Sequence, residues 1–258
     1  METLKIIKIG GNIINNDELL NDFLSDFAQL SSPKILVHGG GKSASELSKK
    51  MGIEPKMIHG RRVTDADTLE IITMVYGGKI NKNVVAKLQA KNCNSVGFSG
   101  ADGNTIVSVK RPVKDIDYGF AGDIVKVNTD VLEILLPNNI TPVFCAITHN
   151  KHGQLLNTNA DTIAAELAVA LSEKYNVSLY YCFEKNGVLE DINNENSVIE
   201  RINSSIFNDL KNNGIINEGM LPKIHNCLAA IEKGVKSVHI GSPTMPFNAR
   251  EKCTTFQQ

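Results

Sequence analysis

Residues 5–11, Lys-Ile-Ile-Lys-Ile-Gly-Gly, place Lys8 inside a run of isoleucines that ends in a pair of glycines. An apolar β-branched run predicts a buried strand. A buried ammonium group is unfavourable unless an anion or a carboxylate meets it, and a lysine in such a strand has little access to water. Gly10 and Gly11 lack a Cβ, so their backbone N–H groups can approach a ligand closely, and phosphate is a common anion at a strand end. We therefore interpret this segment as half of a phosphate site.

Apolar strands alternate with amphipathic helices along the rest of the chain, which predicts a largely parallel sheet covered on both faces. The first helix should bury an apolar stripe that includes Leu19, and Pro33 should end it. The helices are expected at residues 17–30, 43–51, 67–91, 159–172, 204–212 and 219–233. The strands are expected at residues 5–9, 35–37, 96–99, 141–147, 177–183 and 235–240, the last being the final strand, with hairpin segments at 106–109 and 124–127.

Composition describes an ordinary globular chain. It has 258 residues, 42% of them hydrophobic and 21% charged, with a formal net charge of −1. Such a balance disfavours nucleic acid and anionic membranes as partners. The five cysteines form no C-x-x-C pair, which argues against a disulfide framework or a structural zinc. Because neither a signal peptide nor a long apolar run is apparent, we expect a cytoplasmic protein.

Two charged residues lie where helices are expected to begin. Lys223 falls in the first turn of helix 219–233, where a positive charge opposes the helix dipole unless an anion binds there. The alternative is a lysine that points into solvent. Asp161 follows Asn157 and Asn159, and an asparagine cap with an aspartate in the first turn is also what an ordinary helix start prefers. The functional alternative is a carboxylate that orients two lysines, beside asparagines that bind substrate.

Two further motifs have competing interpretations. Residues 38–41, His-Gly-Gly-Gly, follow a strand and precede a helix, as an anion-binding turn does, although three glycines can also mark a tight connection. Arg61 and Arg62 could grip a carboxylate or simply be solvated. His149 and His152 flank a polar turn without an acidic or cysteine partner, so we expect no metal site in the protein. Neither a P-loop pattern nor G-x-G-x-x-G occurs.

Five strings, taken together in their order along the chain, resemble the amino-acid kinase superfamily over essentially the whole length. The closest resemblance is to the branch whose members phosphorylate N-acetylglutamate. The strings are Lys8-Ile9-Gly10-Gly11, Val37-His38-Gly39-Gly40-Gly41, Gly60-Arg61-Arg62-Val63-Thr64, Asn157-Thr158-Asn159-Ala160-Asp161 and Glu218-Gly219-Met220-Leu221-Pro222-Lys223. The resemblance implies an α/β fold, a three-layer αβα sandwich whose central, mainly parallel sheet is shared by two lobes. Residues 1–174 would bind the acyl amino acid and dimerise, and residues 175–258 would bind the nucleotide.

The resemblance also implies a role for each matching residue. Lys8 and Lys223 would stabilise the transferring phosphoryl group, and Asp161 would orient both lysines. Gly10 and Gly11 would bind phosphate, and Gly40, Gly41, Arg62, Asn157 and Asn159 would bind substrate. Glu184, Gly187, Leu189, Ile216 and Asn217 would bind the nucleotide. ATP with Mg²⁺ would be the co-substrate, and the only other partners would be a small acyl amino acid and a second copy of the chain in a homodimer.

The implied reaction is attack of the γ-carboxylate of an N-acyl-glutamate on the γ-phosphate of ATP, in arginine biosynthesis. A carboxylate is already ionised at neutral pH, so lysines and backbone amides suffice without a side-chain base. Acetyl is the default acyl group, with N-succinyl-glutamate or a non-catalytic sensor as alternatives.

Two strings depart from the family pattern. They are Cys182-Phe183-Glu184, where Thr-Asp or Ser-Asp is usual, and Cys253-Thr254-Thr255, where Gly-Thr is commoner. These departures leave the adenine contacts open. Arginine-inhibited relatives carry an extra N-terminal helix before the first strand, so we expect a homodimer insensitive to arginine.

Overall fold

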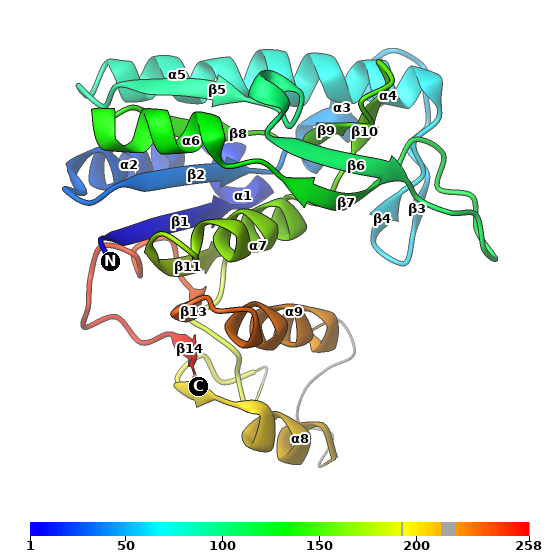
Figure 1. Cartoon of the computed structure of the whole chain (residues 1–258). Helices are drawn as coiled ribbons and strands as arrows, with labels where there is room; N and C mark the ends of the chain where they lie inside the picture. Colours follow the sequence, from blue (N-terminus) through cyan, green and yellow to red (C-terminus); the bar gives the residue numbers. More distant parts are fainter. Residues whose placement is uncertain (192, 213–219, 258) are drawn as a thin grey trace.

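An eight-stranded sheet runs through the whole molecule (Figure 1). The computed structural model describes residues 1–191, 193–212 and 220–257. The strand order is β12 (Arg201–Ile202), β14 (Thr254–Phe256), β13 (Ser237–Gly241), β11 (Asn176–Cys182), β1 (Thr3–Ile9), β2 (Lys34–His38), β8 (Thr141–Phe144) and β5 (Ser95–Phe98). The six strands from β13 to β5 are mutually parallel, whereas β14 runs antiparallel to β13. The predicted α/β sandwich with a mainly parallel central sheet is therefore confirmed.

Helices cover both faces of this sheet (Figure 1). On one face α7 (Ala160–Leu171) packs beside α9 (Leu221–Glu232), and on the other α2 (Asp17–Gln29) packs beside α5 (Asn81–Gln89). The remaining helices are α1 (Gly11–Ile14), α3 (Gly41–Lys50), α4 (Ala66–Ile72), α6 (Asp130–Leu135) and α8 (Ser204–Asn212), with a π-helix η1 (Thr73–Ile80) and 3₁₀ turns η2 (Asp102–Asn104) and η3 (Leu136–Asn138). Strands β1 and β2 are apolar on both faces, as expected for strands covered on both sides.

A second, smaller sheet lies beside α7. Its strands are β10 (Leu155–Asn157), β9 (Ile147–His149), β6 (Ile106–Lys110) and β7 (Gly122–Val127). The predicted hairpin of residues 106–109 and 124–127 is confirmed as the antiparallel β6–β7 pair. A short hairpin of β3 (Met57–Ile58) and β4 (Arg61–Arg62) completes the strands and brings Arg62 back toward α3.

One predicted strand is wrong in its extent, and one predicted helix is confirmed as helical from Ala66 to Gln89 but differs in its local geometry. The strand expected at 141–147 breaks after Phe144, because the chain leaves the main sheet at Cys145 and enters the second sheet at Ile147. The helix expected at 67–91 changes to π-helical geometry at Thr73–Ile80, a segment that contains two adjacent glycines, which are poor α-helix formers.

Two further predictions were also wrong. Leu19, expected on the buried stripe of the first helix, is 48% exposed. The strand β13 is not the last one, since β14 follows and pairs antiparallel with it. Three residues are too few to show the period-two pattern on which strand prediction depends, so β14 was not recognisable from sequence.

His38 is fully buried at the end of β2 and is held in its neutral form. Its Nδ1 lies 2.8 Å from the Gly39 carbonyl oxygen, and its Nε2 lies 3.1 Å from Nδ2 of Asn81. The Asn81 amide group also donates to the Val143 carbonyl at 2.9 Å, so Nε2 of His38 acts as an acceptor. Burial lowers the pKa of His38 to about 4.

We predict that the protein loses stability on mild acidification through His38. Between pH 6.5 and about 4 the unfolded chain binds a proton that the folded chain does not. The free energy of unfolding should therefore fall with decreasing pH, by on the order of 3 kcal/mol in total from this residue. Urea unfolding between pH 7 and 4.5 measures the slope, which should be shallower in His38→Gln.

His239 serves as the control because burial lowers its pKa to about 4 as well. The His239→Gln variant should keep the contribution of His38 and lose only its own. An identical pH slope in the wild type and in His38→Gln would contradict the assignment.

Candidate active site

The carboxyl ends of four neighbouring parallel strands meet at one edge of the main sheet. Ile9 of β1 pairs with His38 of β2 and with Cys182 of β11, and Cys182 pairs with Gly241 of β13. Turns rich in glycine follow β1 and β2, and the Gly39 N–H donates to the Ile9 carbonyl at 3.3 Å. In open α/β sheets, ligands bind outside the carboxyl ends of the strands. A ligand site is therefore expected at this edge of the sheet.

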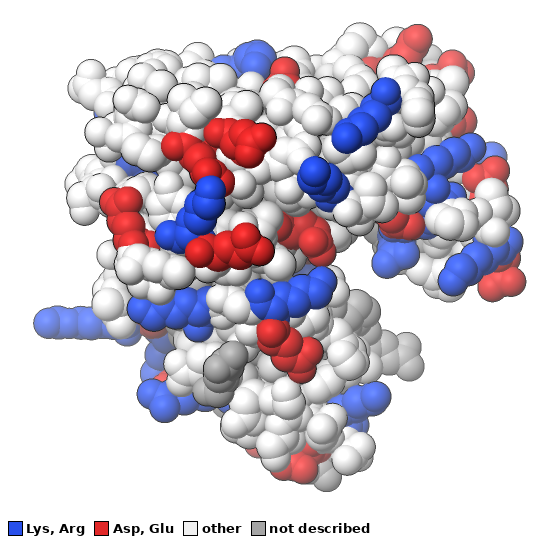
Figure 2. All heavy atoms as spheres, viewed as in Figure 1, with Lys and Arg blue, Asp and Glu red and all other residues white. Residues whose placement is uncertain are grey.

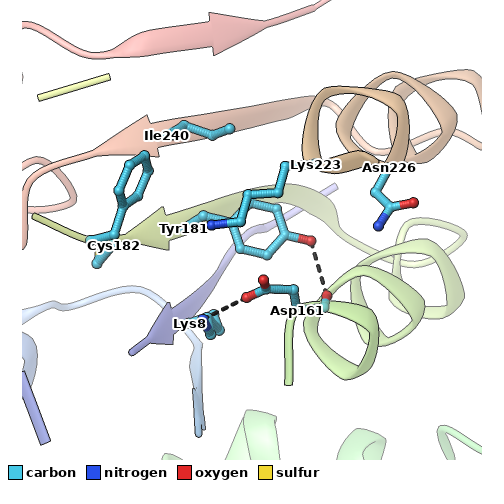
Figure 3. Close-up of a pocket in the computed structure, with 8 residues that line it drawn as sticks. Lys8, Asp161, Tyr181, Cys182, Lys223, Asn226 and Ile240 are labelled. Carbon is cyan, nitrogen blue, oxygen red and sulfur yellow. Dashed lines mark hydrogen bonds and ion pairs between the residues drawn. The ribbon is translucent and has the colours of Figure 1, made fainter. Parts of the chain in front are cut away.

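Lys8 and Asp161 form an ion pair at this edge (Figure 3), with 2.6 Å between Lys8 Nζ and Asp161 Oδ1. Their side chains are 16% and 23% exposed. Asp161 is held in the first turn of α7, where its N–H donates to Oδ1 of the capping Asn159 at 2.7 Å. Burial by itself would raise the pKa of Asp161, but the ammonium groups of Lys8 and Lys223 outweigh it and hold that pKa below its ordinary value.

Lys223 lines the same cavity as this ion pair (Figure 3). It lies in the first turn of α9, and its Nζ is 5.1 Å from the centre of the Phe183 ring. The other lining residues are Tyr181, Cys182, Phe183, Asn226 and Ile240. The Tyr181 hydroxyl donates to the Asp161 carbonyl at 3.0 Å, which ties β11 to the start of α7. Two lysines far apart in the sequence therefore share one cavity with the carboxylate.

The glycine turn after β1 lies next to Lys8, and the glycine turn after β2 lies next to Arg62. A Cβ on Gly10 would be 3.9 Å from Lys8 Nζ, and Gly11 begins helix α1 directly after it. Gly40 has no room for a side chain at all, because a Cβ there would be 2.6 Å from Ile80 Cδ1. A Cβ on Gly41 would be 3.8 Å from Nη2 of Arg62. Gly40 and Gly41 thus form a close-packed turn that faces the Arg62 guanidinium.

Arg62 is a buried cation that has no carboxylate partner in the part of the chain that the structure describes. It is 8% exposed, and its Nη2 donates to the Gly41 carbonyl at 2.8 Å and to Ser45 Oγ at 2.7 Å. Its Nη1 is buried and has no hydrogen-bond partner within the described residues. Asn157 is linked to Arg62 through Thr64, whose Oγ1 accepts from Asn157 Nδ2 at 3.0 Å and donates to the Arg62 carbonyl at 3.2 Å. A buried guanidinium with a free donor is the arrangement that an anionic ligand would complete.

The residues expected at the nucleotide are less closely grouped. Glu184 is exposed and does not line the cavity of Lys8. Gly187 is packed against β14, since a Cβ there would be 2.7 Å from Thr254 Oγ1. Leu189 forms an isolated bridge with Val198. Ile216 and Asn217 lie outside the described residues.

Sequence reasoning missed several residues that line the cavity. Asn226 follows Lys223 by three positions on α9, a spacing that places both side chains on one face of a helix and could have revealed it. Tyr181, Phe183 and Ile240 carry no comparable signal, because they are apolar or aromatic positions of buried strands.

Three further features concern the surface charge, possible metal ligands and possible membrane-spanning helices. Acidic and basic side chains intermingle on the face shown in Figure 2, and neither sign covers it. Within residues 1–191, 193–212 and 220–257, no group of three or more His, Cys, Asp or Glu side chains is arranged to hold a metal ion. Within the same residues, every helix is too short or too polar to cross a bilayer.

The chain is similar to one family model and to several known proteins. A family model described as the amino acid kinase family matches residues 3–242. An acetylglutamate kinase of Cytophaga hutchinsonii is 57% identical over 241 residues, which are 93% of this chain and 91% of that protein. One from Parabacteroides distasonis is 52% identical over 240 residues, covering 93% and 94% of the two chains.

Solved structures share the fold. The structure of smu.665 from Streptococcus mutans matches with a TM-score of 0.80 at 27% identity, covering 98% of both chains. A carbamate kinase from Giardia lamblia bound to AMP-PNP matches with a TM-score of 0.69 at 15% identity, covering 100% of this chain and 98% of that one. At that identity the likeness concerns the fold alone.

We predict that Lys8 and Asp161 are strongly coupled in stability. Lys8→Met leaves a carboxylate in a largely buried position without its partner, so the free energy of unfolding should fall by about 2–4 kcal/mol. In the double variant Lys8→Met/Asp161→Asn neither charge remains, and much of that loss should be recovered. Urea unfolding of the four proteins at pH 7 gives the coupling energy.

The exposed ion pair between Lys87 and Asp17, whose side chains are 36% and 95% exposed, is the matched control. Its double-mutant cycle should show a coupling of less than about 1 kcal/mol. Strictly additive effects at Lys8 and Asp161 would mean that the two groups are not paired in solution.

Proposed function

The chain belongs to the amino acid kinase family, and on this premise we propose that it transfers the γ-phosphoryl group of ATP to the γ-carboxylate of N-acetyl-L-glutamate. The relatives that support this substrate are named acetylglutamate kinase and match over more than nine-tenths of the chain. The observation that carries the proposal is the cavity in which Lys8, Asp161 and Lys223 meet. It is a site suited to neutralising an anion.

The reaction brings two anions together, so most of the catalysis is positioning and charge neutralisation. Lys8 and Lys223 contact the transferring phosphoryl group and stabilise the negative charge spread over its oxygens. Asp161 Oδ1 forms an ion pair with Lys8 Nζ at 2.6 Å and so fixes the direction of the ammonium group. The attacking carboxylate is ionised at neutral pH, and the γ-carboxylate therefore needs no general base.

The backbone N–H groups of Gly10 and Gly11 donate hydrogen bonds to phosphate oxygens. ATP binds as its Mg²⁺ complex, because a divalent cation neutralises the β- and γ-phosphate oxygens during such transfers. The nucleotide lies over the carboxyl ends of β11 and β13, beside Glu184, Gly187 and Leu189. Ile216 and Asn217 would contribute from the stretch before α9.

Arg62 holds the acyl amino acid on the other side of the glycine turns. Its Nη1, which has no partner among the described residues, and its planar guanidinium suit a carboxylate, and Gly41 leaves room for the ligand to approach the backbone beside Arg62. Asn157 and the Nδ2 group of Asn159 offer further hydrogen bonds, since Oδ1 of Asn159 is engaged in capping α7.

The proposed division of labour follows the sheet. Residues 1–174 form a lobe for the acyl amino acid and for contact with a second copy of the chain, and residues 175–258 form a lobe for the nucleotide. Strands β1 and β11 join the two lobes over seven paired residues, from Thr3 and Asn176 to Ile9 and Cys182. We further propose that the enzyme works in the cytoplasm, as a homodimer, in arginine biosynthesis.

A panel of acceptors tests the proposed function directly. ADP release is measured with N-acetylglutamate, N-succinylglutamate, glutamate and aspartate, each in the presence of ATP and Mg²⁺. We expect turnover with N-acetylglutamate to exceed that with free glutamate and aspartate, which lack the acyl group.

The same panel separates the alternatives. Preferential turnover of N-succinylglutamate would change the acyl group and keep the reaction. Binding of an acceptor without any ADP release would contradict the assignment as a kinase and favour a sensor.

A further inference from the structure

Tyr76 lies in the π-helical segment Thr73–Ile80 and contacts the glycine turn after β2. It is 5% exposed, and its Cδ1 would be 2.7 Å from a Cβ on Gly40. The ring therefore fills the space that glycine leaves at this position. π-helical turns are rare and occur often at functional sites, which directs attention to what the Tyr76 hydroxyl does.

The hydroxyl of Tyr76 and the guanidinium of Arg62 converge on Gly41. A Cβ on Gly41 would be 3.8 Å from Arg62 Nη2 and 3.9 Å from Tyr76 Oη. Burial raises the pKa of Tyr76, and the nearby Arg62 charge offsets only part of that shift. The hydroxyl is thus neutral at physiological pH and carries a proton that it can donate.

The substrate of the proposed reaction has an α-carboxylate and a γ-carboxylate, and the two must bind to different groups of the protein. The γ-carboxylate has to reach the cavity of Lys8 and Lys223, whereas Arg62 and Tyr76 are not among the residues that line that cavity. Arg62 retains a buried Nη1 donor without a partner in the described part of the chain. An anion that contacts this group and the neighbouring Tyr76 hydroxyl would satisfy the donor.

We propose that the Tyr76 hydroxyl and the Arg62 guanidinium together bind the α-carboxylate of the acyl amino acid. This inference rests on the proposed function and adds a specificity residue to it. Tyr76 donates one hydrogen bond to the carboxylate, and Arg62 supplies the opposite charge. A ligand without the α-carboxylate would leave both groups unsatisfied, so the pair would select for acyl amino acids over simple acyl amides.

Two ligands and three proteins test the proposal. The ligands are N-acetylglutamate and N-acetyl-4-aminobutyrate, which keeps the acetamido group and the distal carboxylate but lacks the α-carboxylate. The proteins are the wild type, Tyr76→Phe and Tyr180→Phe. Phenylalanine preserves the packing against Gly40 and removes only the hydroxyl. Tyr180 is a control of the same kind, since its ring stacks on His239 with centroids 4.7 Å apart.

Dissociation constants from titration calorimetry and steady-state kinetics with saturating ATP are the readouts. Tyr76→Phe should weaken N-acetylglutamate binding and raise its KM roughly 10-fold or more, as expected for loss of a hydrogen bond to a charged group. Turnover at saturating N-acetylglutamate and the KM for ATP should stay unchanged. Affinity for N-acetyl-4-aminobutyrate should be the same in all three proteins, and Tyr180→Phe should match the wild type with both ligands.

Unchanged N-acetylglutamate binding in Tyr76→Phe, or an equal loss with both ligands, would overturn the role of the hydroxyl. Those results would leave the kinase assignment intact, because it depends on turnover by the wild type. A wild type that neither binds nor phosphorylates N-acetylglutamate would overturn the proposed function, and this inference would fall with it.

Discussion

The ion pair of Lys8 with Asp161 is the constraint around which the site is arranged. Lys8 is placed on β1, a central strand whose other side chains are mostly buried and apolar, so its ammonium group must find negative charge nearby. Asp161 provides it from the first turn of α7, where the helix N-terminus also favours a carboxylate. One carboxylate facing two lysines leaves a net positive cavity. That excess charge is what a transferring phosphoryl group can use.

The sheet explains how residues far apart in sequence reach this cavity. Strand β1 lies between β2 and β11, so the turns that follow these strands open at the same edge. The carboxyl ends of β11 and β13 and the start of α9 come from the second half of the chain and bring Lys223 to the same place. The shared sheet thus gives a geometric reason for placing an acceptor on one side of the site and a nucleotide on the other.

Much of this arrangement could be predicted because local sequence patterns determined it. Three local signals restrict the structure: a lysine in an apolar strand, glycines at strand ends, and charged residues at helix starts. Their order along the chain is consistent with one fold. The juxtaposition of Lys8 with Asp161 was a hypothesis that required both helices and strands to be placed correctly. The structure places them correctly, whereas the chemical roles stay predictions.

Other features depended on tertiary contacts that no short pattern encodes. The break of the strand after Phe144 follows from pairing with a second sheet, and β14 is defined by its neighbour β13 and not by its own three residues. Tyr76 meets Gly40 only because a π-helix crosses the glycine turn. Local propensity says little about such crossings, because they depend on residues that are far apart in the sequence.

The central claim is that two ammonium groups act on one transferring phosphoryl group, and the turnover number of Lys8→Ala and Lys223→Ala tests it most directly. Each variant should lower kcat with N-acetylglutamate by a factor on the order of 10² to 10³, as expected for loss of one donor to the transition state. Lys233→Ala, an exposed lysine at the opposite end of α9, should keep wild-type turnover. Wild-type turnover in folded Lys8→Ala and Lys223→Ala would contradict the account.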